Sequence, residues 1–406
     1  MNYRDALRWL YATQRFGIKL GLENTRRLFD SLGVPAPAQR ILHVAGTNGK
    51  GSVCAMMDAI CRAAGYRTAL FTSPHLVTFR ERIRVDGEFI SEEEVAHGLT
   101  SIRRLIATWD PPPTFFEITT ALALDHFRKV GADIIVLETG LGGRLDSTNA
   151  VQPIVSILTP IDYDHQKWLG HTLTEIAGEK AGIIKADVPV VSAAQPAEAA
   201  AVIKARAAAC NAPLTFVRHP LLHFPVGLLG FHQKENAALA LAALHAGNIP
   251  VDDAAIARGL AEVNWPARFQ RWDDRTIIDG AHNPAGARAL VRAWQETFGN
   301  QRATAILAVL NDKEVGILCH ALAPIMGRAL LPAIRSERAL APETLSLTIK
   351  GLDPVIRSAV LPSFAHAWRD AQEMEAPILI TGSLHFAGEA LAHLRGEPAA
   401  YEECLQ

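Results

Sequence analysis

One segment, residues 43–53 with the sequence HVAGTNGKGSV, constrains the fold more than any other part of the chain. It follows an apolar run at 41–44 that suits a buried strand. Apolar residues then recur at helical spacing after the loop: Val53, Met56, Met57, Ile60 and Ala64. The order strand, glycine loop and helix predicts a phosphate site, because loop N–H groups and the positive end of a helix attract anions.

The spacing of this loop departs from the common pattern G-x-x-x-x-G-K-[ST]. Val44 stands where the first glycine should be, and Gly51 stands where the hydroxyl should be. A glycine-rich connector is the alternative interpretation. Lys50 can reach terminal phosphates and Ser52 can approach a magnesium ion, so the loop with both residues favours a nucleotide.

Length and composition limit the class of protein. A chain of 406 residues predicts two domains, and 49% hydrophobic with 20% charged residues is typical of a globular enzyme. The formal net charge of −2 gives no reason to expect nucleic-acid binding. The charged amino end and the lack of an 18-residue apolar run predict a cytoplasmic protein without membrane attachment. Five scattered cysteines predict reduced thiols, with Cys54 and Cys61 in the core.

The first part of the chain alternates predicted strands and helices. Its apolar runs end at Phe71, Glu138, Leu158 and Ser192. This alternation predicts a mostly parallel sheet with helices on both faces. Ligands of such sheets gather at the carboxyl ends of the strands, which is where Ser73, Glu138 and Asp162 stand.

A second α/β unit is predicted after residues 265–274, where the sequence WPARFQRWDD breaks the alternation. New strand-and-turn segments follow: RTIIDG, ATAILAVLND, ALLPAIRS and APILITGS. We therefore expect domains at 1–270 and 271–406, the second being smaller. The alanine-rich segment at 193–213 predicts a surface helix.

Seven further segments stand beside the loop in a fixed order: FTSPHL (71–76), TFFEITTALA (114–123), LETGLGGRLDSTN (137–149), DYDHQKWLGHTLTEIAGEKAGIIK (162–185), GFHQKENAALA (230–240), DGAHNPAG (279–286) and TGSLHFAG (381–388). With the loop, they closely resemble the folylpolyglutamate synthase and dihydrofolate synthase family of Mur-type ATP-dependent amide ligases. The resemblance runs from about Gly17 to Gly388. The family's loop reads G-T-N-G-K-G-[ST], which accounts for the offset from the common pattern.

The resemblance implies a Mur ligase-like fold, with a central-like ATPase domain and a Rossmann-like glutamate ligase domain. It also implies a reaction that joins a carboxylate to the amine of glutamate. A carboxylate is a poor electrophile at neutral pH, so ATP must first convert it to an acyl phosphate. Magnesium, which prefers oxygen ligands, would neutralise the phosphate oxygens.

By resemblance, the residues expected to hold magnesium, at two sites, are Ser52, Ser73, Glu138, His165 and Lys180. Lys180 matches a lysine that is carbamylated in the family, which turns a cation into an anionic oxygen donor. The alternatives are a capping or ion-paired carboxylate for Glu138 and a surface charge for Lys180. We interpret Lys185 as a surface charge.

The same resemblance assigns contacts with ATP and the reacting groups. The expected ATP residues are Thr47, Asn48, Gly49, Lys50, Gly51, Ser52, Asn236, Arg268 and Asp279. Arg268 would hold phosphate, while Asn236 and Asp279 would hydrogen-bond adenine and ribose. The expected catalytic residues are Lys50, Lys180, His282 and Ser383. A structural role is the alternative for His282, and Ser383 would support it.

For the pterin substrate, three matching segments imply Lys19, Leu20, Gly21, Leu22, Thr114, Phe115, Phe116, Glu117, Leu145, Asp146 and Ser147. The two phenylalanines offer flat apolar faces, with core packing as the alternative. The chain departs from many relatives at three places. They have Asp where this chain has Lys19, and Gly where it has Ala267. They also have Gly at the position of Ala308 or Val309.

These observations predict a monomeric ligase that adds L-glutamate to dihydropteroate and to reduced folates, with ATP, glutamate and the pteroate or folate as its small-molecule partners. One alternative is an enzyme that only extends glutamate tails. Another is a peptidoglycan Mur ligase, which would need an amino-terminal domain of ~100 residues before the loop. A nucleotide-binding regulator is the third, but it would have little need for Glu138, His165 and Lys180 together.

Overall fold

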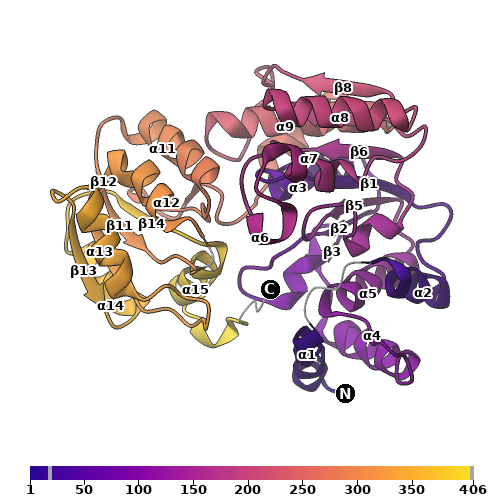
Figure 1. The fold of residues 1–406 in the computed structure, drawn as a ribbon, viewed down its shortest axis with the longest axis horizontal. Helices are drawn as coiled ribbons and strands as arrows, with labels where there is room; N and C mark the ends of the chain where they lie inside the picture. Colours follow the sequence, from indigo (N-terminus) through magenta and orange to yellow (C-terminus); the bar gives the residue numbers. More distant parts are fainter. Residues whose placement is uncertain (17–20, 312, 403–406) are drawn as a thin grey trace.

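The structure is a computed structural model that describes residues 1–16, 21–311 and 313–402. Two β-sheets with helices on both faces form its framework, one in the first two thirds of the chain and one in the last third (Figure 1). The two sheets lie side by side along the long axis of the molecule. This architecture confirms the predicted α/β class.

The first sheet has the strand order β4-β3-β2-β5-β1-β6-β7-β8. Its strands are β1 (Arg40–Ala45), β2 (Thr68–Phe71), β3 (Ile83–Val85), β4 (Glu88–Phe89), β5 (Ile134–Glu138), β6 (Val155–Leu158), β7 (Val190–Ala193) and β8 (Leu214–Val217). Neighbouring strands are parallel in the run β2-β5-β1-β6-β7-β8. Strand β3 runs antiparallel to β2 and to β4. The carboxyl ends of the parallel strands therefore share one edge.

Strand β5 shows why both faces of this sheet are covered. All five of its residues are buried, because alternate side chains enter opposite cores. Ile135 and Leu137 enter one core, and Ile134 and Val136 enter the other. The first core lies under α1 (Tyr3–Ala12), α2 (Glu23–Leu32), α4 (Glu92–Leu105) and α5 (Phe115–Val130). The second lies under α3 (Lys50–Ala63), α9 (Phe231–Ala246) and α10 (Asp253–Glu262).

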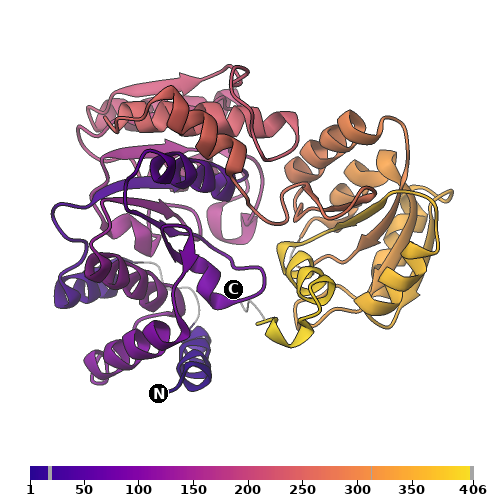
Figure 2. The same cartoon turned by 180° about the vertical axis from the view of Figure 1, so that it is seen from behind.

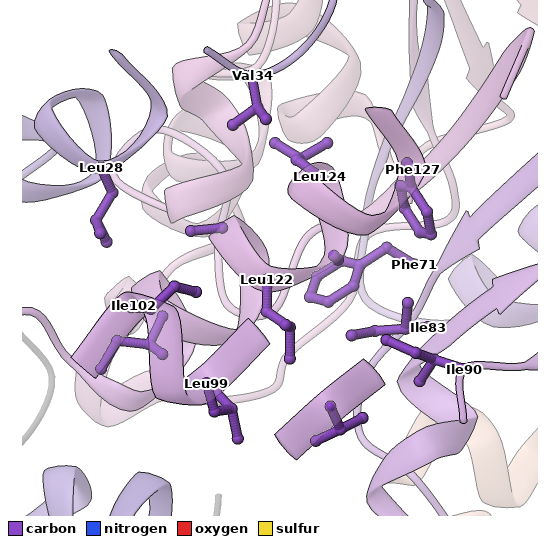
Figure 3. Packing of buried hydrophobic residues seen from close by; sticks show 14 of the residues in the cluster. Leu28, Val34, Phe71, Ile83, Ile90, Leu99, Ile102, Leu122, Leu124 and Phe127 are labelled. Atoms are coloured by element: carbon purple, nitrogen blue, oxygen red, sulfur yellow. The ribbon is translucent and has the colours of Figure 1, made fainter. Parts of the chain in front are cut away.

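Figure 3 shows part of the first of these cores, where side chains from helices and strands meet. Leu99 and Ile102 of α4 lie near Leu122 of α5, and Phe71 comes from β2. Burying a leucine, isoleucine or phenylalanine in this way contributes about 1.5–3 kcal/mol each. This core therefore anchors α5, whose first turn lies beside the edge where the parallel strands end.

The remaining elements of the first part lie at its rim. The helices α7 (Leu173–Ala181) and α8 (Ala197–Ala209) pack together over the β6–β8 end of the sheet. Helix α8 confirms the predicted alanine-rich helix and buries Ala199, Ile203 and Ala207. The short helices are η1 (Thr13–Phe16), η2 (Phe79–Arg82), η3 (Ser147–Ala150) and α6 (Gln166–Leu169).

The second sheet has the order β13-β12-β11-β14-β10-β9 and is parallel except for the β9–β10 pair. Its strands are β9 (Gln270–Arg271), β10 (Thr276–Ile278), β11 (Ala303–Leu307), β12 (Met326–Pro332), β13 (Arg357–Leu361) and β14 (Ile378–Thr381). One face carries α11 (Pro284–Phe298), α12 (Val315–Leu322) and α13 (Pro342–Leu352). The other face carries α14 (Phe364–Gln372) and α15 (Leu384–Leu394), with η4 (Ala323–Ile325) and η5 (Pro398–Ala400) beside these layers.

The end of the described chain returns to the first part of the molecule. Glu402 accepts hydrogen bonds from the backbone N–H of Phe79, at 2.6 Å, and from the Tyr3 hydroxyl, at 3.2 Å. The second unit is thus linked to the first both at residues 263–269 and through its carboxyl end.

Sequence and structure differ in two elements of the second unit. Strands β9 and β13 were not predicted, whereas the four predicted strands correspond to β10, β11, β12 and β14. Strand β13 is an edge strand with exposed Arg357 and Val360, so it lacks the continuous apolar run of a buried strand. The division at 270/271 stays a prediction.

None of the helices in the described ranges is long and apolar enough to cross a membrane.

Candidate active site

The glycine-rich loop connects β1 to α3 at the edge where the parallel strands end. Thr47 holds the loop against the segment after β6, because its hydroxyl donates to Asp162 O, 3.0 Å away, and its N–H donates to Pro160 O. Helix α3 begins at Lys50, and Gly49 is its N-cap. The N-terminal N–H groups of α3 therefore point into the loop, as expected for a phosphate site.

Close neighbours explain three glycines of this loop. A Cβ atom at Gly46 would lie 1.9 Å from Thr159 Oγ1, and one at Gly49, which has φ +85°, would lie 2.7 Å from Asn236 Oδ1. At Gly51 a Cβ atom would lie 2.7 Å from the Trp265 indole nitrogen. Gly51 is the position where the common pattern has a hydroxyl residue, so Trp265 gives a steric reason for the departure.

Two polar groups of the loop are held ready for a ligand. Lys50 Nζ folds back and donates to the carbonyls of Gly46 and Thr47, both at 3.2 Å. Ser52 Oγ is buried and finds no hydrogen-bond partner among the described residues. A buried hydroxyl without a partner costs about 1–3 kcal/mol, which a bound ligand can recover.

A carboxylate faces this loop from the end of β5. Glu138 is buried and accepts a hydrogen bond at 3.1 Å from the backbone N–H of Ser73, which follows β2. Burial raises the pKa of Glu138 above its ordinary value, although Lys50 and the Ser73 amide act in the opposite direction. The two residues line a cleft together with Gly51, Trp265 and Arg268.

Lys180 lies inside the molecule rather than on its surface. Its side chain comes from α7, is 4% exposed, and donates from Nζ to Gly46 O at 2.8 Å. Burial, with the nearby charge of Lys50, lowers the pKa of the Lys180 amine to about 7. Lys185 is partly buried and donates to Asn149 O at 2.7 Å, so its interpretation as a surface charge was wrong.

Arg268, from the segment that joins the two units, lines the cleft, and Asp279 of the second unit lies near it. Asp279 follows β10, and its two oxygens accept from the N–H groups of Phe269 (2.7 Å) and Ala281 (2.8 Å). Burial raises the pKa of Asp279, opposed by the Phe269 amide and Arg268. Arg268 lies between Ala267 and Phe269, which both have positive φ values, of 57° and 46°. The backbone is thus bent sharply where the arginine enters the cleft.

Asn236 joins this group from α9. Its side chain is buried, donates to Gln233 Oε1 at 3.0 Å, and lies against Gly49. The expected nucleotide contacts from the loop, α9 and the segment before β9 therefore surround one edge of the first sheet.

His282 and Ser383 follow strands β10 and β14 of the second sheet. His282 Nδ1 lies 2.8 Å from Gly280 O, so Nδ1 is the donor and Nε2 is the nitrogen that can accept a proton. Ser383 is the N-cap of α15, where its Oγ accepts from Phe386 N at 3.1 Å and donates to Ala308 O at 3.4 Å. These bonds give Ser383 a structural role in addition to the one expected from the resemblance.

Asp164, in the loop after β6, was missed by the sequence analysis. Its buried carboxylate accepts from Lys313 Nζ at 2.8 Å and from Asn283 Nδ2 at 3.0 Å, and it lies 3.5 Å from His282 Nε2. Burial alone would raise the pKa of Asp164, but His282, His165 and Lys313 outweigh this and hold it well below its ordinary value. Its position beyond a strand end was the available signal.

His165, the residue after Asp164, is the N-cap of α6 and has φ +50°. Its ring is 41% exposed, with Nε2 3.9 Å from Asp164 Oδ2. Figure 1 shows α6 on the side of the first unit that faces the second sheet. The His165 ring is therefore accessible from solvent.

On the pterin side, Lys19 and Leu20 lie outside the described residues. Thr114 is the N-cap of α5 and forms a capping box with Glu117, whose second oxygen accepts from Thr25 Oγ1 at 3.1 Å. Phe115 is buried and stacks on Tyr11 with ring centroids 5.4 Å apart. These three side chains have structural partners.

Of the remaining pterin-side candidates, Asp146 and Ser147 also have hydrogen-bond partners within the protein. Asp146 accepts from the N–H groups of Gly140 (2.9 Å) and Leu141 (2.8 Å) and from Thr148, and Ser147 Oγ lies 2.8 Å from Thr120 Oγ1. Leu22 is buried, whereas Gly21 is half-buried. Phe116 and Leu145 are also half-buried, and the Phe116 ring lies against Gly140. Phe116 is thus the more exposed of the two adjacent phenylalanines.

The donor set around the loop fits a magnesium ion. Ser52 Oγ lacks a partner in the described part of the chain, and the buried Glu138 carboxylate lines a cleft with Gly51, the residue before Ser52. Magnesium prefers oxygen donors and retains several waters, so few protein ligands suffice. In the described ranges no three His, Cys, Asp or Glu side chains form a group that could hold a metal ion.

Comparison with known proteins places these residues in a family. Residues 44–217 match the family model of the Mur ligase middle domain, and residues 267–384 match that of the Mur ligase, glutamate ligase domain. The dihydrofolate synthase/folylpolyglutamate synthase of Bacillus subtilis (strain 168) is 38% identical over 77% of this chain and 80% of its own length. This chain belongs to the dihydrofolate synthase/folylpolyglutamate synthase family of Mur ligases.

Another relative and two solved structures cover nearly the whole chain. The folylpolyglutamate synthase of Lacticaseibacillus casei is 33% identical over 98% of this chain and 99% of its own. Escherichia coli FolC, solved with DHPP and ADP, has 31% identity and a TM-score of 0.87 over 96% of this chain and 98% of its own. The Yersinia pestis bifunctional enzyme, solved with AMPPNP and a Mn ion, has 30% identity and a TM-score of 0.88 over 97% and 98%.

Proposed function

We propose that this chain is an ATP-dependent ligase that joins L-glutamate to dihydropteroate and to the γ-carboxylate of reduced folates. Membership of the family supports this function. One observation carries it: Asn48 of the phosphate loop hydrogen-bonds Asn283, the residue after His282. This contact brings the phosphate loop of the first unit close to His282 of the second unit, which supports a single site that both units form.

The reaction has two steps. The acceptor carboxylate attacks the γ-phosphorus of ATP, which forms an acyl phosphate and releases ADP. The amine of glutamate then attacks the acyl carbon, phosphate leaves with the former carboxylate oxygen, and one proton is released. The site must hold three charged reactants together and accept that proton.

Residues of the cleft suit these tasks. Lys50 and Arg268 supply positive charge for phosphate oxygens, and Lys50 can exchange its bonds to the loop carbonyls for bonds to phosphate. His282 Nε2 accepts the proton of the amine, and Asp164, 3.5 Å from it, stabilises the imidazolium that results. Asn236 and Asp279 hold the nucleoside.

Magnesium at two sites would neutralise the phosphate oxygens when bound. The residues that would hold it are Ser52, Ser73, Glu138, His165 and a carbamylated Lys180. The burial of Lys180 supports the modification, because a buried amine loses part of its preference for the charged form. Carbamylation would also give Lys180 oxygen donors in place of its bond to Gly46 O.

The acceptor would bind beside Phe116 and Leu145, near the first turn of α5. Dihydropteroate and a folate share their rings and differ in where the reacting carboxylate lies, so they must bind at different depths. The names of the Bacillus subtilis and Escherichia coli relatives, which carry both activities, support a bifunctional enzyme. An enzyme that only extends glutamate tails is the alternative, favoured by the unusual Lys19 and by the name of the Lacticaseibacillus casei relative.

We further propose that the enzyme is a cytoplasmic monomer whose partners are small molecules. The balanced charge supports the absence of a nucleic-acid partner. The completeness of the candidate site within one chain supports the monomer, since loop, carboxylates and histidines all come from the same polypeptide.

One assay tests the proposed function against its alternatives. Formation of ADP is measured with ATP and magnesium while glutamate and the acceptor are each omitted in turn. We expect ADP only when glutamate and either dihydropteroate or a mono-glutamyl folate are both present. Product from the folate alone identifies the tail-extending enzyme. Turnover that needs a peptidoglycan precursor, or that needs no acceptor, would contradict the proposal.

A further inference from the structure

The carboxylate of Asp164 connects the two units of the molecule. Asp164 belongs to the loop after β6, but its oxygens bind groups of the second unit: Lys313 Nζ on Oδ1 at 2.8 Å and Asn283 Nδ2 on Oδ2 at 3.0 Å. Asp164 and Lys313 side chains are 8% and 9% exposed, so this is a buried ion pair between residues 149 positions apart.

Asn283 extends this connection to the phosphate loop. Its amide exchanges two hydrogen bonds with the amide of Asn48, at 3.1 and 3.3 Å. The same side chain caps α11 by accepting from Gly286 N at 2.8 Å. Asn48 stands between Thr47 and Gly49 in the loop that precedes α3. A continuous polar chain thus runs from Lys313 through Asp164 and Asn283 to the phosphate loop.

We propose that Asp164 is a positioning residue that couples closure of the second unit to the phosphate loop, and this inference rests on the proposed ligase function. Closure brings Lys313 and Asn283 to Asp164, and Asn283 then fixes Asn48. The same contact holds His282 Nε2 beside a carboxylate at the cleft. Catalytic turnover therefore depends on a pair that need not touch any substrate.

A role in positioning the two units differs from a simple contribution to stability. A buried ion pair gains little net stability, because desolvation offsets its attraction, but it strongly disfavours any arrangement that buries one partner alone. Here the pair spans the cleft, so it selects one relative position of the two units. Another carboxylate of the same loop, Asp162, pairs with Arg288 at 2.9 Å, but those side chains are 32% and 59% exposed. An exposed pair contributes little.

The test compares Asp164→Asn, Lys313→Met, the double variant and the matched control Asp162→Asn. Asp164→Asn keeps an oxygen for Asn283 but removes the charge that Lys313 needs. Steady-state kcat and KM are measured for ATP, glutamate and acceptor. The radius of gyration is measured by solution scattering with a non-hydrolysable ATP analogue and acceptor bound. Thermal unfolding verifies that each variant is folded.

We expect Asp164→Asn to lower kcat by roughly 5–150-fold, the usual range for coupling between sites, with KM for ATP changed much less. The bound complex of this variant should be larger than the wild-type complex. Lys313→Met should give a similar loss, and the double variant should be no worse than the poorer single variant. Asp162→Asn should resemble the wild type in all of these measurements.

Three results would overturn the inference: a kcat of Asp164→Asn within twofold of wild type, an equal loss in Asp162→Asn, or losses that multiply in the double variant. If Asp164→Asn does not fold, Lys313→Met decides by the same criteria. A wild type that never ligates glutamate would refute the proposed function. In that case the scattering comparison with the ATP analogue alone still tests the coupling.

Discussion

The ATP side and the pterin side of the candidate site satisfy their polar groups differently. Near the phosphate loop, Ser52 Oγ finds no partner in the described part of the chain, and the buried Lys180 amine reaches a loop carbonyl. Beside α5, Thr114 and Glu117 cap the helix, and Asp146 accepts several backbone N–H groups. Buried polar groups are costly unless paired. The polar groups on the ATP side therefore await a ligand as a partner, whereas the motif residues on the pterin side largely pair with one another.

Lys50→Ala should have the largest effect. It removes a charge aimed at phosphate from a loop with little packing to lose, so we expect kcat to fall by roughly 10²–10³-fold while thermal unfolding changes little. Lys204→Ala, on the exposed face of α8, is the matched control for loss of a lysine. Turnover of Lys50→Ala close to that of the control would remove the lysine from the phosphate site.

Lys180 provides the second test of the ATP side. We expect carbon-13 NMR with labelled bicarbonate to detect a carbamate on active enzyme, and Lys180→Gln to lack that signal. Loss of a group that orients the metal typically costs at least about 10–100-fold in activity. Full activity with an unmodified amine would show that burial of Lys180 serves another purpose.

Phe116→Ala tests whether the pterin side binds the acceptor. The half-buried ring offers an aromatic face, whose loss we expect to raise KM for the acceptor by roughly 2–10-fold and to leave KM for ATP unchanged. Steady-state kinetics with each substrate varied in turn measures this. Equal increases in both KM values would mean that the variant perturbs the sheet edge rather than the acceptor pocket.

Thr114→Ala should have the smallest effect on turnover. Because Thr114 caps α5, we expect a loss of about 0.5–2 kcal/mol in the free energy of unfolding, with acceptor KM nearly unchanged. Denaturant unfolding and kinetics on the same preparation give both quantities. A large rise in acceptor KM without a loss of stability would contradict the structural role of Thr114 and support a direct contact with the substrate.

Short-range patterns in the sequence explain why the strand ends and the glycine loop were predicted correctly. The predicted ends of apolar runs at Phe71, Glu138 and Leu158 are the last residues of β2, β5 and β6, because buried parallel strands are continuous apolar runs. The glycine loop was recognisable because strand, glycines and helix are adjacent. Ala267, one of the positions at which glycine was expected from the resemblance, has φ +57°, a conformation that favours glycine.

Long-range contacts explain what was missed. Asp164 and Lys313 are 149 residues apart, and no periodicity in either segment indicates that they pair. The capping box of Thr114 and Glu117 was readable as T-x-x-E before an apolar helix, but the resemblance directed those residues to the substrate. Resemblance thus identifies candidate site residues, whereas their hydrogen-bond partners show which of these residues stabilise the local structure.

Transfer of an oxygen atom from the acceptor carboxylate to phosphate is the distinguishing property of a ligase that forms an acyl phosphate. Dihydropteroate labelled with oxygen-18 in its carboxylate is ligated to glutamate with unlabelled ATP, and the released phosphate is analysed by phosphorus-31 NMR. If the carboxylate attacks the γ-phosphorus held at the loop, each phosphate carries one oxygen-18 atom from the acceptor. Ligated product accompanied by unlabelled phosphate would contradict an acyl-phosphate ligase.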